Sequence, residues 1–289
     1  MKPEHKEEMK KRARNICLRV AYDGTDYCGF QRQKPPGRAV QNVLEEALEK
    51  IFGDSIELAA AGRTDAGVHA LGQVVNFFTD GKIPLAKIPV AVNAVLPKDI
   101  VITHAFEADF SFSARHSAIS KTYVYRVYRG ERGNDGGVSL PSPFKGRFAW
   151  YVPRELNFCA MEEALALIRG EHDFSSFRAS PKGSVNRRAA ALIGSVRTIY
   201  RAELNFSPQD DLLTFTFHGS GFLYHMVRNI VGTVIDVGKG KLTTEDFRRI
   251  FQARDRNLAS PTAPPQGLFL VAVEYADKKN NFESVNIAL

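Results

Sequence analysis

The chain is 289 residues long, 44% of its residues are apolar and 25% are charged, and its formal net charge is +7. This length and composition are typical of a globular protein of about two domains, whose cores are large enough to fold without disulfides or metal. The three cysteines are scattered and the histidines show no metal-ligand spacing, which argues against a disulfide framework and a zinc site, so we expect no metal and a reducing, cytoplasmic location.

The positive charge indicates a polyanionic partner, although a merely basic soluble protein has the same charge. No run of 18 apolar residues occurs, so we expect no membrane span. Residues 1–14 mix lysine and arginine with glutamate and lack an apolar stretch, which predicts a flexible basic tail. We expect an N-terminal domain over residues 15–116 and a C-terminal domain over residues 117–289.

Hydrophobic periodicity and turn residues predict the elements of each domain. In the first domain they give helices at 40–52 and 85–96 and strands at 16–22, 56–61, 73–78 and 100–107. In the second domain they give helices at 156–169, 222–237 and 243–253 and strands at 122–128, 196–206, 212–217 and 268–275. Because strands and helices mix without regular βαβ alternation, we expect an α+β fold.

The segment Ala60–Ala70 has the sequence AAGRTDAGVHA. Glycines and small side chains surround one cation, Arg63, and one anion, Asp65, and small neighbours allow a large planar substrate to approach the backbone closely. A carboxylate held beside an arginine stays ionised and oriented, so it can act as a nucleophile. The same short pattern also fits a turn aspartate that pairs locally with an arginine.

Five segments occur in an order that is typical of one known family. They are YDGTDYCGFQRQ (Tyr22–Gln33), AGRTDAGVHA (Ala61–Ala70), FSARHSAISKTYVYRV (Phe112–Val127), GEHDFSSFRA (Gly170–Ala179) and GFLYHMVRNIVG (Gly221–Gly232). Through these segments, which extend from about residue 16 to residue 275, the chain resembles the tRNA pseudouridine synthase A (TruA) family.

The resemblance implies an α+β fold of two related domains, each an antiparallel sheet with helices on one face, which meet at a basic cleft. It implies an isomerase that converts uridine to pseudouridine at positions 38, 39 and 40 of the tRNA anticodon stem-loop, without a cofactor and as a homodimer. Carried over residue by residue, the resemblance implies that Asp65 is the nucleophile, that Tyr123 stacks on the flipped-out base, and that Arg228 is the partner of the Asp65 carboxylate. Arg63 helps to extrude or hold the target nucleotide.

The reaction explains why these residue types are needed. Uridine loses its C1′–N1 bond, the base rotates, and C1′ rejoins the base at C5, so a carboxylate is needed to attack the electron-poor C1′ or to assist a glycal route. Base flipping costs a few kcal/mol, and stacking on an aromatic ring returns about 1–3 kcal/mol. A hydrolase that uses Asp65 is an alternative function. The loop has no second acid to accompany Asp65 in such a reaction, and abasic RNA among the products would favour this alternative.

Several expectations have simpler alternatives. Without the resemblance, Tyr123 fits a strand aromatic that faces the core and Arg228 fits a solvated surface arginine. A non-catalytic RNA-binding or folding-helper protein of the same fold is the rival function. Six further basic residues are candidate contacts to RNA phosphates, which position a substrate without reading its sequence. Each of them fits a simple surface charge equally well. These candidates are Arg32, Lys34, Arg38, Lys182, Arg187 and Arg188.

Overall fold

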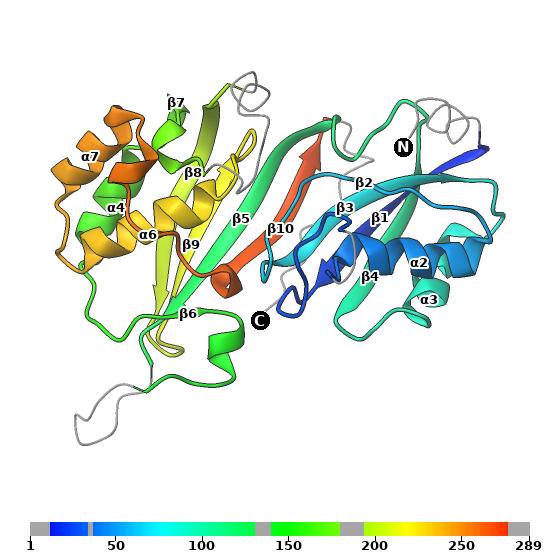
Figure 1. The fold of residues 1–289 in the computed structure, drawn as a ribbon, viewed down its shortest axis with the longest axis horizontal. Coiled ribbons are helices and arrows are strands. Elements are labelled where there is room, and N and C mark those ends of the chain that lie inside the picture. The colour runs from blue at the N-terminus through cyan, green and yellow to red at the C-terminus, as the bar shows by residue number, and fades with distance from the viewer. Residues whose placement is uncertain (1–11, 34–36, 131–139, 180–193, 277–289) are drawn as a thin grey trace. The chain divides into compact units, whose positions relative to one another are not determined.

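The computed structural model describes residues 12–33, 37–130, 140–179 and 194–276. Contacts between residues divide the chain into two compact units (Figure 1): Met1–Lys121 with Phe269–Leu289, and Thr122–Leu268. The final strand of the chain therefore groups with the first unit. The domain bounds expected from the sequence, 15–116 and 117–289, stay a prediction.

The first unit is built on a sheet with the strand order β4-β1-β3-β10. Its strands are β1 (Arg14–Tyr22), β2 (Ala59–Ala60), β3 (His69–Thr79), β4 (Ile100–Ala108) and β10 (Leu268–Tyr275). β1 runs antiparallel to β3 and β4, with Leu18 opposite Val75 and Ala105. The sheet is not wholly antiparallel, because β10 runs parallel to β3. This arrangement makes β1 a central strand, and its residues 15–20 are all buried.

Two helices accompany this sheet. α2 (Val40–Phe52) buries the side chains of Val40, Leu44, Ala47 and Leu48 and ends at Gly53, which has φ 72° and donates its N–H to the Glu49 carbonyl. A left-handed glycine that bonds back in this way ends a helix. α3 (Ile88–Asn93) is shorter than the predicted helix, because a 3₁₀ turn at Leu85–Lys87 precedes it. Pro89 lies in its first turn, where a missing N–H costs nothing.

The second unit has the strand order β5-β9-β8-β7, and β6 runs parallel to β5. Its strands are β5 (Ala118–Tyr128), β6 (Trp150–Tyr151), β7 (Gly170–Asp173), β8 (Val196–Ser207) and β9 (Leu212–Gly219), and its helices are α4 (Phe158–Ala166), α6 (Met226–Gly238) and α7 (Thr244–Ala253). α4 contacts α6, α7 and β8, and Figure 1 shows these three helices gathered together beside the strands. Strands and helices in both units confirm the α+β class.

α6 begins later than the sequence predicts. The expected helix starts at residue 222, whereas α6 starts at Met226, after His225 with a φ of 59°. A left-handed residue cannot continue a right-handed helix toward the N-terminus, so the chain makes a separate turn before α6, in which Met226 N donates to Leu223 O at 3.0 Å. The helix itself is almost entirely buried, and Gly232 allows it to approach the carbonyl of Pro261.

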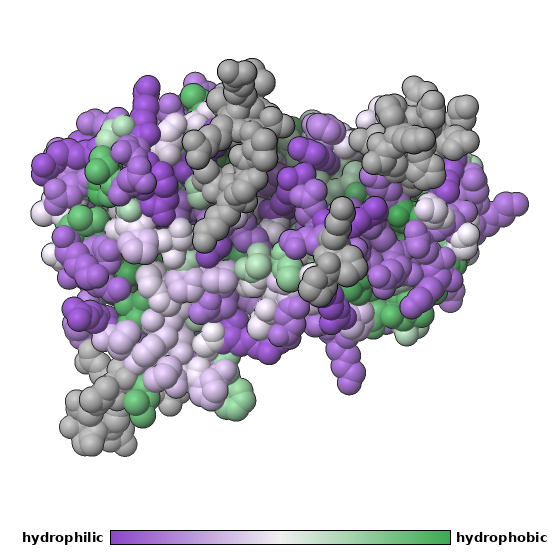
Figure 2. Space-filling view, viewed as in Figure 1, coloured by the Kyte–Doolittle hydropathy of each residue, from purple (hydrophilic) through white to green (hydrophobic). Residues whose placement is uncertain are grey.

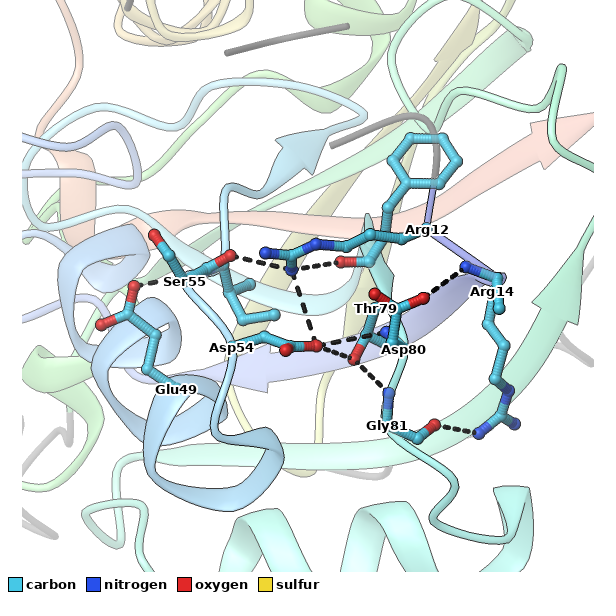
Figure 3. A network of polar contacts seen from close by, with 11 residues as sticks. Arg12, Arg14, Glu49, Asp54, Ser55, Thr79, Asp80 and Gly81 are labelled. Atoms are coloured by element: carbon cyan, nitrogen blue, oxygen red, sulfur yellow. Dashed lines mark hydrogen bonds and ion pairs between the residues drawn. The ribbon is translucent and has the colours of Figure 1, made fainter. Parts of the chain in front are cut away.

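A polar network joins the start of β1 to the turn after α2 and to the end of β3 (Figure 3). Arg12 donates to the carbonyl oxygens of Ser55 (3.0 Å) and Phe78 (3.2 Å) and lies 3.6 Å from a carboxylate oxygen of Asp54. Thr79 donates its hydroxyl to that same Asp54 oxygen at 2.6 Å. The three segments are thus fixed to one another by contacts that satisfy the Asp54 carboxylate.

Figure 2 shows hydrophilic residues over most of the face in view, with hydrophobic residues scattered among them. The large apolar side chains that are exposed come from separate parts of the fold, as Val90 in α3 and Phe144 in the second unit illustrate. Within the described residues, no helix is both long and apolar enough to cross a membrane.

Candidate active site

The loop that carries Asp65 connects β2 to β3 in the first unit; we refer to Ala61–Val68 as the Asp65 loop. Ala61 N donates to Val74 O at 2.8 Å where the loop begins, and Val68 N donates to Asp65 O at 3.2 Å, which closes a turn within the loop. Such main-chain bonds fix the path of a loop without using its side chains. Main-chain hydrogen bonds therefore fix the path of the Asp65 loop between β2 and β3.

The segment that follows β1 packs directly against the Asp65 loop. Phe30 N donates to Thr64 O at 3.1 Å, and Gly67 N donates to Tyr27 O at 3.2 Å. These two bonds join the first two segments of the family resemblance, 22–33 and 61–70. The loop is thus braced from outside as well as from within.

Two glycines make this close packing possible. A Cβ on Gly24 would lie 2.0 Å from the carbonyl oxygen of Val68, and a Cβ on Gly29 would lie 2.7 Å from that of Thr64. Gly29 also has a φ of +98°, a conformation that side-chain-bearing residues rarely adopt. Larger residues at either position would push the two segments apart and so displace the backbone around Asp65.

His69 anchors the point at which the Asp65 loop enters β3. Its ring is buried, lies stacked on Phe269 at 4.7 Å between centroids, and accepts a bond at Nδ1 from the N–H of Gly24 at 3.0 Å. A carboxylate oxygen of Asp23 lies 3.1 Å from the same nitrogen. The end of the loop is therefore fixed by a buried side chain as well as by backbone bonds.

The loop presents its two charged side chains at the surface of the unit. Asp65 is half-buried and Arg63 is exposed. Partial desolvation, and then the nearby charge of Arg115, lower the pKa of Arg63. An arginine stays protonated at physiological pH in spite of such a shift, so this part of the unit combines one carboxylate with two guanidinium groups. The arrangement suits a carboxylate that acts on a bound anion such as a nucleotide.

In the second unit, Tyr123 lies in β5 and Arg228 in α6. Tyr123 is buried, and its ring meets that of Phe222 edge-on with 5.0 Å between centroids. Arg228 is half-buried, and its Nε donates to the carbonyl oxygen of Ala263 at 2.8 Å, while Ala263 N donates to the carbonyl of Arg228 at 3.1 Å. The backbone around residue 263 therefore orients the Arg228 side chain.

The candidate phosphate contacts divide into two groups. Arg32 forms an ion pair with the buried carboxylate of Glu45 (Nη2–Oε2 2.6 Å), which gives its charge an internal partner. Arg38 is exposed and lies over the ring of Tyr27, 5.0 Å from its centroid. The other candidates lie outside the described residues: Lys34, Lys182, Arg187 and Arg188.

Some residues of this region were not predicted from the sequence. The sequence places Arg115 in a segment that resembles the family, but nothing in its spacing indicates that it lies near Arg63. The pairing of Asp23 and Gly24 with His69 was also missed, although a glycine directly after Asp23 in the first segment was a usable signal. In the described part of the chain, no group of three or more His, Cys, Asp or Glu side chains is arranged to hold a metal ion.

Comparisons with known proteins found similar sequences over most of the chain. Residues 19–117 and 164–276 match the family model described as tRNA pseudouridine synthase. The chain is 42% identical over 262 residues to tRNA pseudouridine synthase A of Caldicellulosiruptor bescii, covering 91% of this chain and 100% of that protein. It is 44% identical over 260 residues to tRNA pseudouridine synthase A of Geobacillus kaustophilus, covering 90% and 93%. Among solved structures, a Cbf5-Nop10-Gar1 complex matches with a TM-score of 0.37 and 14% identity, over 94% of this chain and 53% of the other.

Proposed function

The chain belongs to the tRNA pseudouridine synthase family, and from this premise we propose that it isomerises uridine to pseudouridine at positions 38, 39 and 40 of the tRNA anticodon stem-loop, with Asp65 as the nucleophile. The observation that carries the proposal is the Asp65 loop itself. Its backbone is hydrogen-bonded to the segment 22–33 on both sides of Asp65, at Thr64 and at Gly67. The Asp65 side chain is half-buried at the surface of the unit. No cofactor is needed for this reaction.

The chemistry needs a carboxylate at the anomeric carbon. As the C1′–N1 bond breaks, the electron pair leaves with the base and C1′ becomes electron-poor. Asp65 either captures C1′, or removes the C2′ proton so that a glycal forms and later returns it, and the two routes place an Asp65 oxygen beside C1′ or the adjacent C2′. The base then turns, C5 bonds to C1′, the C5 proton departs, and N1, which kept the electron pair of the broken bond, takes up a proton. Net atoms are conserved, so the product is an isomer of the substrate.

A held loop suits this reaction better than a mobile one. A carboxylate within reach of C1′ must be fixed to within a fraction of an ångström, because misplacement by about 1 Å costs on the order of 100-fold in rate. The two bonds from the segment after β1, at Thr64 and Gly67, supply such fixation. Water must also be kept from C1′ while the base is free, and the small side chains of the loop leave room for the substrate to fill the space.

We propose that Tyr123 stacks on the extruded base and that its phenol assists removal of the C5 proton. Its place in a strand and its edge-on contact with Phe222 support a ring held in one orientation. Only 8% of Tyr123 is exposed, so stacking on a base requires part of its ring to be uncovered. Base stacking on an aromatic face contributes about 1–3 kcal/mol, which offsets part of the cost of flipping.

We propose that Arg228 pairs with the Asp65 carboxylate and that Arg63 holds the target nucleotide. The bond from Arg228 Nε to Ala263 O fixes the plane of the guanidinium, which favours a directed contact over diffuse charge. Arg63 is exposed and shares its surroundings with Arg115, so a phosphate there neutralises two cations that otherwise repel each other.

We also propose that the protein works in the cytoplasm as a homodimer, as the family resemblance implies. Size-exclusion chromatography with light scattering measures the mass in solution. A mass of twice 32.1 kDa supports the dimer, and a monomer at enzyme-assay concentrations contradicts it.

The proposed function is tested by mapping pseudouridine in an unmodified tRNA transcript after treatment with the wild-type protein and with Asp65→Asn. We expect new pseudouridine at positions 38–40 with the wild type and none with Asp65→Asn. The matched control is Asp109→Asn, which removes an exposed carboxylate of the same unit and is expected to leave the reaction unchanged.

Each alternative function gives a different outcome. Pseudouridine at other positions keeps the chemistry and changes the target site. Abasic RNA or free uracil indicates a hydrolase. A folded wild-type protein that binds tRNA but forms no pseudouridine indicates the non-catalytic RNA-binding alternative.

A further inference from the structure

Three buried polar side chains, two from the sheet and one from the Asp65 loop itself, connect the loop to the sheet. Tyr22 is the last residue of β1, Gln73 belongs to β3, and Thr64 directly precedes Asp65. Their exposed fractions are 4%, 0% and 7%. Polar groups this deeply buried cost free energy unless they are hydrogen-bonded, so their arrangement is specific.

The contacts among these side chains run from the strands to the loop. The Tyr22 hydroxyl lies 2.8 Å from Thr64 Oγ1, and Gln73 Nε2 donates to the carbonyl oxygen of Gly62 at 2.8 Å. The Gln73 side chain also hydrogen-bonds to Tyr22. Together the two strand residues hold Gly62 and Thr64, one on each side of Arg63.

We propose that Tyr22 and Gln73 are positioning residues for the reaction: through Thr64 and Gly62 they set the direction in which the Asp65 carboxylate points. This inference rests on the proposed function, because it assigns to the two residues an effect on Asp65 as the nucleophile. Neither residue contacts the substrate. The sheet thus acts on the reacting group through two hydrogen bonds.

The geometry favours positioning over a general contribution to stability. Thr64 is held at two atoms, since Tyr22 bonds to its side chain while Phe30 N donates to its carbonyl. A residue fixed at both atoms cannot rotate without breaking a buried hydrogen bond, and the adjoining peptide of Asp65 must follow it. Burial raises the pKa of Tyr22, so the hydroxyl remains protonated and the contact persists throughout the range in which the enzyme is assayed.

The inference is tested with Tyr22→Phe and Thr64→Val, each of which removes one hydroxyl of the contact, and with Thr64→Ser, which keeps the hydroxyl. We expect kcat for pseudouridine formation in a tRNA transcript to fall about tenfold in the first two variants, because a carboxylate that is misdirected by a fraction of an ångström reacts more slowly. We expect KM for tRNA to stay within about twofold, since neither residue contacts RNA. Thr64→Ser is expected to retain most of the wild-type kcat.

A double variant separates a shared effect from two independent ones. If Tyr22 and Thr64 act through one contact, Tyr22→Phe with Thr64→Val lowers kcat no further than either change alone. The matched control is Tyr275→Phe. It removes a buried tyrosine hydroxyl of the same unit that donates to the carbonyl of Ala114 at 2.9 Å, not to the Asp65 loop, and is expected to keep the wild-type kcat.

The outcomes distinguish this inference from the proposed function. If the wild type forms no pseudouridine, the proposed function fails and the positioning role fails with it. If the wild type is active and Tyr22→Phe and Thr64→Val have its kcat, the proposed function stands and the positioning role is wrong. If Tyr22→Phe or Thr64→Val unfolds below the assay temperature, Thr64→Ser is compared with the wild type instead. Because Thr64→Ser keeps the hydroxyl, a tenfold loss of kcat in this variant overturns the inference.

Discussion

Two polar regions of the first unit lie at opposite ends of the same pair of strands. The register of β1 and β3 places Arg14 opposite Thr79 at one end and Tyr22 opposite Ala70 at the other. The network of Figure 3 surrounds the first end, and the Asp65 loop leaves the second. Both regions depend on buried or half-buried polar contacts, but they use their carboxylates in different ways.

In the network, the carboxylates are the groups that hold the structure together. Asp54 accepts from the Thr79 hydroxyl (2.6 Å) and from Asp80 N (3.2 Å), and Asp80 accepts from Ala13 N (2.8 Å). In the Asp65 loop, the bonds that hold the segment run through the main chain and through Thr64. The fold thus uses the Asp54 carboxylate for stability, whereas we assign the chemistry to Asp65, whose loop is fixed through its main chain and through Thr64.

The largest effect on stability is expected where the loop is packed most closely. Gly24→Ala places a Cβ 2.0 Å from Val68 O, a backbone atom that cannot move without shifting the Asp65 loop. We expect stability to fall by about 1–3 kcal/mol and kcat to fall with it. Thermal unfolding and pseudouridine formation measure the two effects.

Gly53→Ala is the matched control for this prediction. Gly53 has a φ of +72° but no atom within 4 Å of an added Cβ. We expect only the cost of a left-handed alanine, about 1 kcal/mol, with kcat unchanged. If Gly24→Ala behaves like Gly53→Ala, the close contact with Val68 does not control the loop.

The next effect separates the two carboxylates. Asp54→Asn weakens the acceptor of the Thr79 bond and removes the charge beside Arg12, so we expect it to destabilise the protein by about 1–2 kcal/mol while kcat stays unchanged. Asp65→Asn is expected to do the reverse: it abolishes turnover and leaves the unfolding midpoint close to that of the wild type. If Asp54→Asn loses turnover at a temperature where it is fully folded, the assignment of stability to Asp54 and of the reaction to Asp65 is wrong.

Much of the fold followed from the sequence because local signals and tertiary packing agree there. The helix 40–52 was predicted from its apolar spacing and from Gly53, and α2 has those bounds. The strands predicted at 56–61 and 73–78 were less accurate, since β2 covers only Ala59–Ala60 and β3 begins at His69. β3 starts earlier because Phe269 and Leu270 of β10 pair with His69 and Ala70, a contact between distant segments that no local pattern records.

The site was predictable only as far as its residue types and the resemblance allowed. Arg63 and Asp65 were identified from a loop of small residues, and the structure places them where the β2–β3 connection is braced. Tyr22 and Gln73 were missed because a tyrosine at the end of a strand and a glutamine within one fit ordinary strand positions. Their hydrogen bonds to the loop depend on the register of β1 and β3, which the sequence alone does not specify.

A smaller effect concerns acid conditions. The hydrogen bond from Thr79, aided by Asp80 N–H and by the charge of Arg12, holds the pKa of Asp54 below its ordinary value against the opposing effect of burial. A carboxylate with a depressed folded-state pKa stabilises the protein above its unfolded-state pKa, and this stabilisation disappears as pH falls through the folded-state pKa. We therefore expect the stability advantage of the wild type over Asp54→Asn to be constant near neutral pH and to shrink below about pH 4.

Urea unfolding of both proteins at a series of pH values measures this difference. A Thr79→Val variant is the matched control, because it removes the largest contribution to the depressed pKa and leaves the carboxylate in place. We expect its stability to be less dependent on pH in the acid range than that of the wild type. If the stability advantage of the wild type over Asp54→Asn grows as the pH falls, the pKa of Asp54 is not depressed in the folded protein and the prediction is wrong.

The smallest effect distinguishes the two arginines near the first motif by the salt dependence of tRNA binding. Arg38 is exposed and lies over the ring of Tyr27. If it contacts a phosphate, Arg38→Ala makes the plot of log binding constant against log salt concentration less steep by about 0.7–0.9. Arg32 already neutralises Glu45, so Arg32→Ala is expected to keep the slope and instead to destabilise the protein, because it leaves a carboxylate that is 5% exposed without its cation. Equal changes of slope in both variants would show that the ion pair with Glu45 opens when RNA binds, and the distinction between a structural and a substrate-binding arginine would then fail at this position.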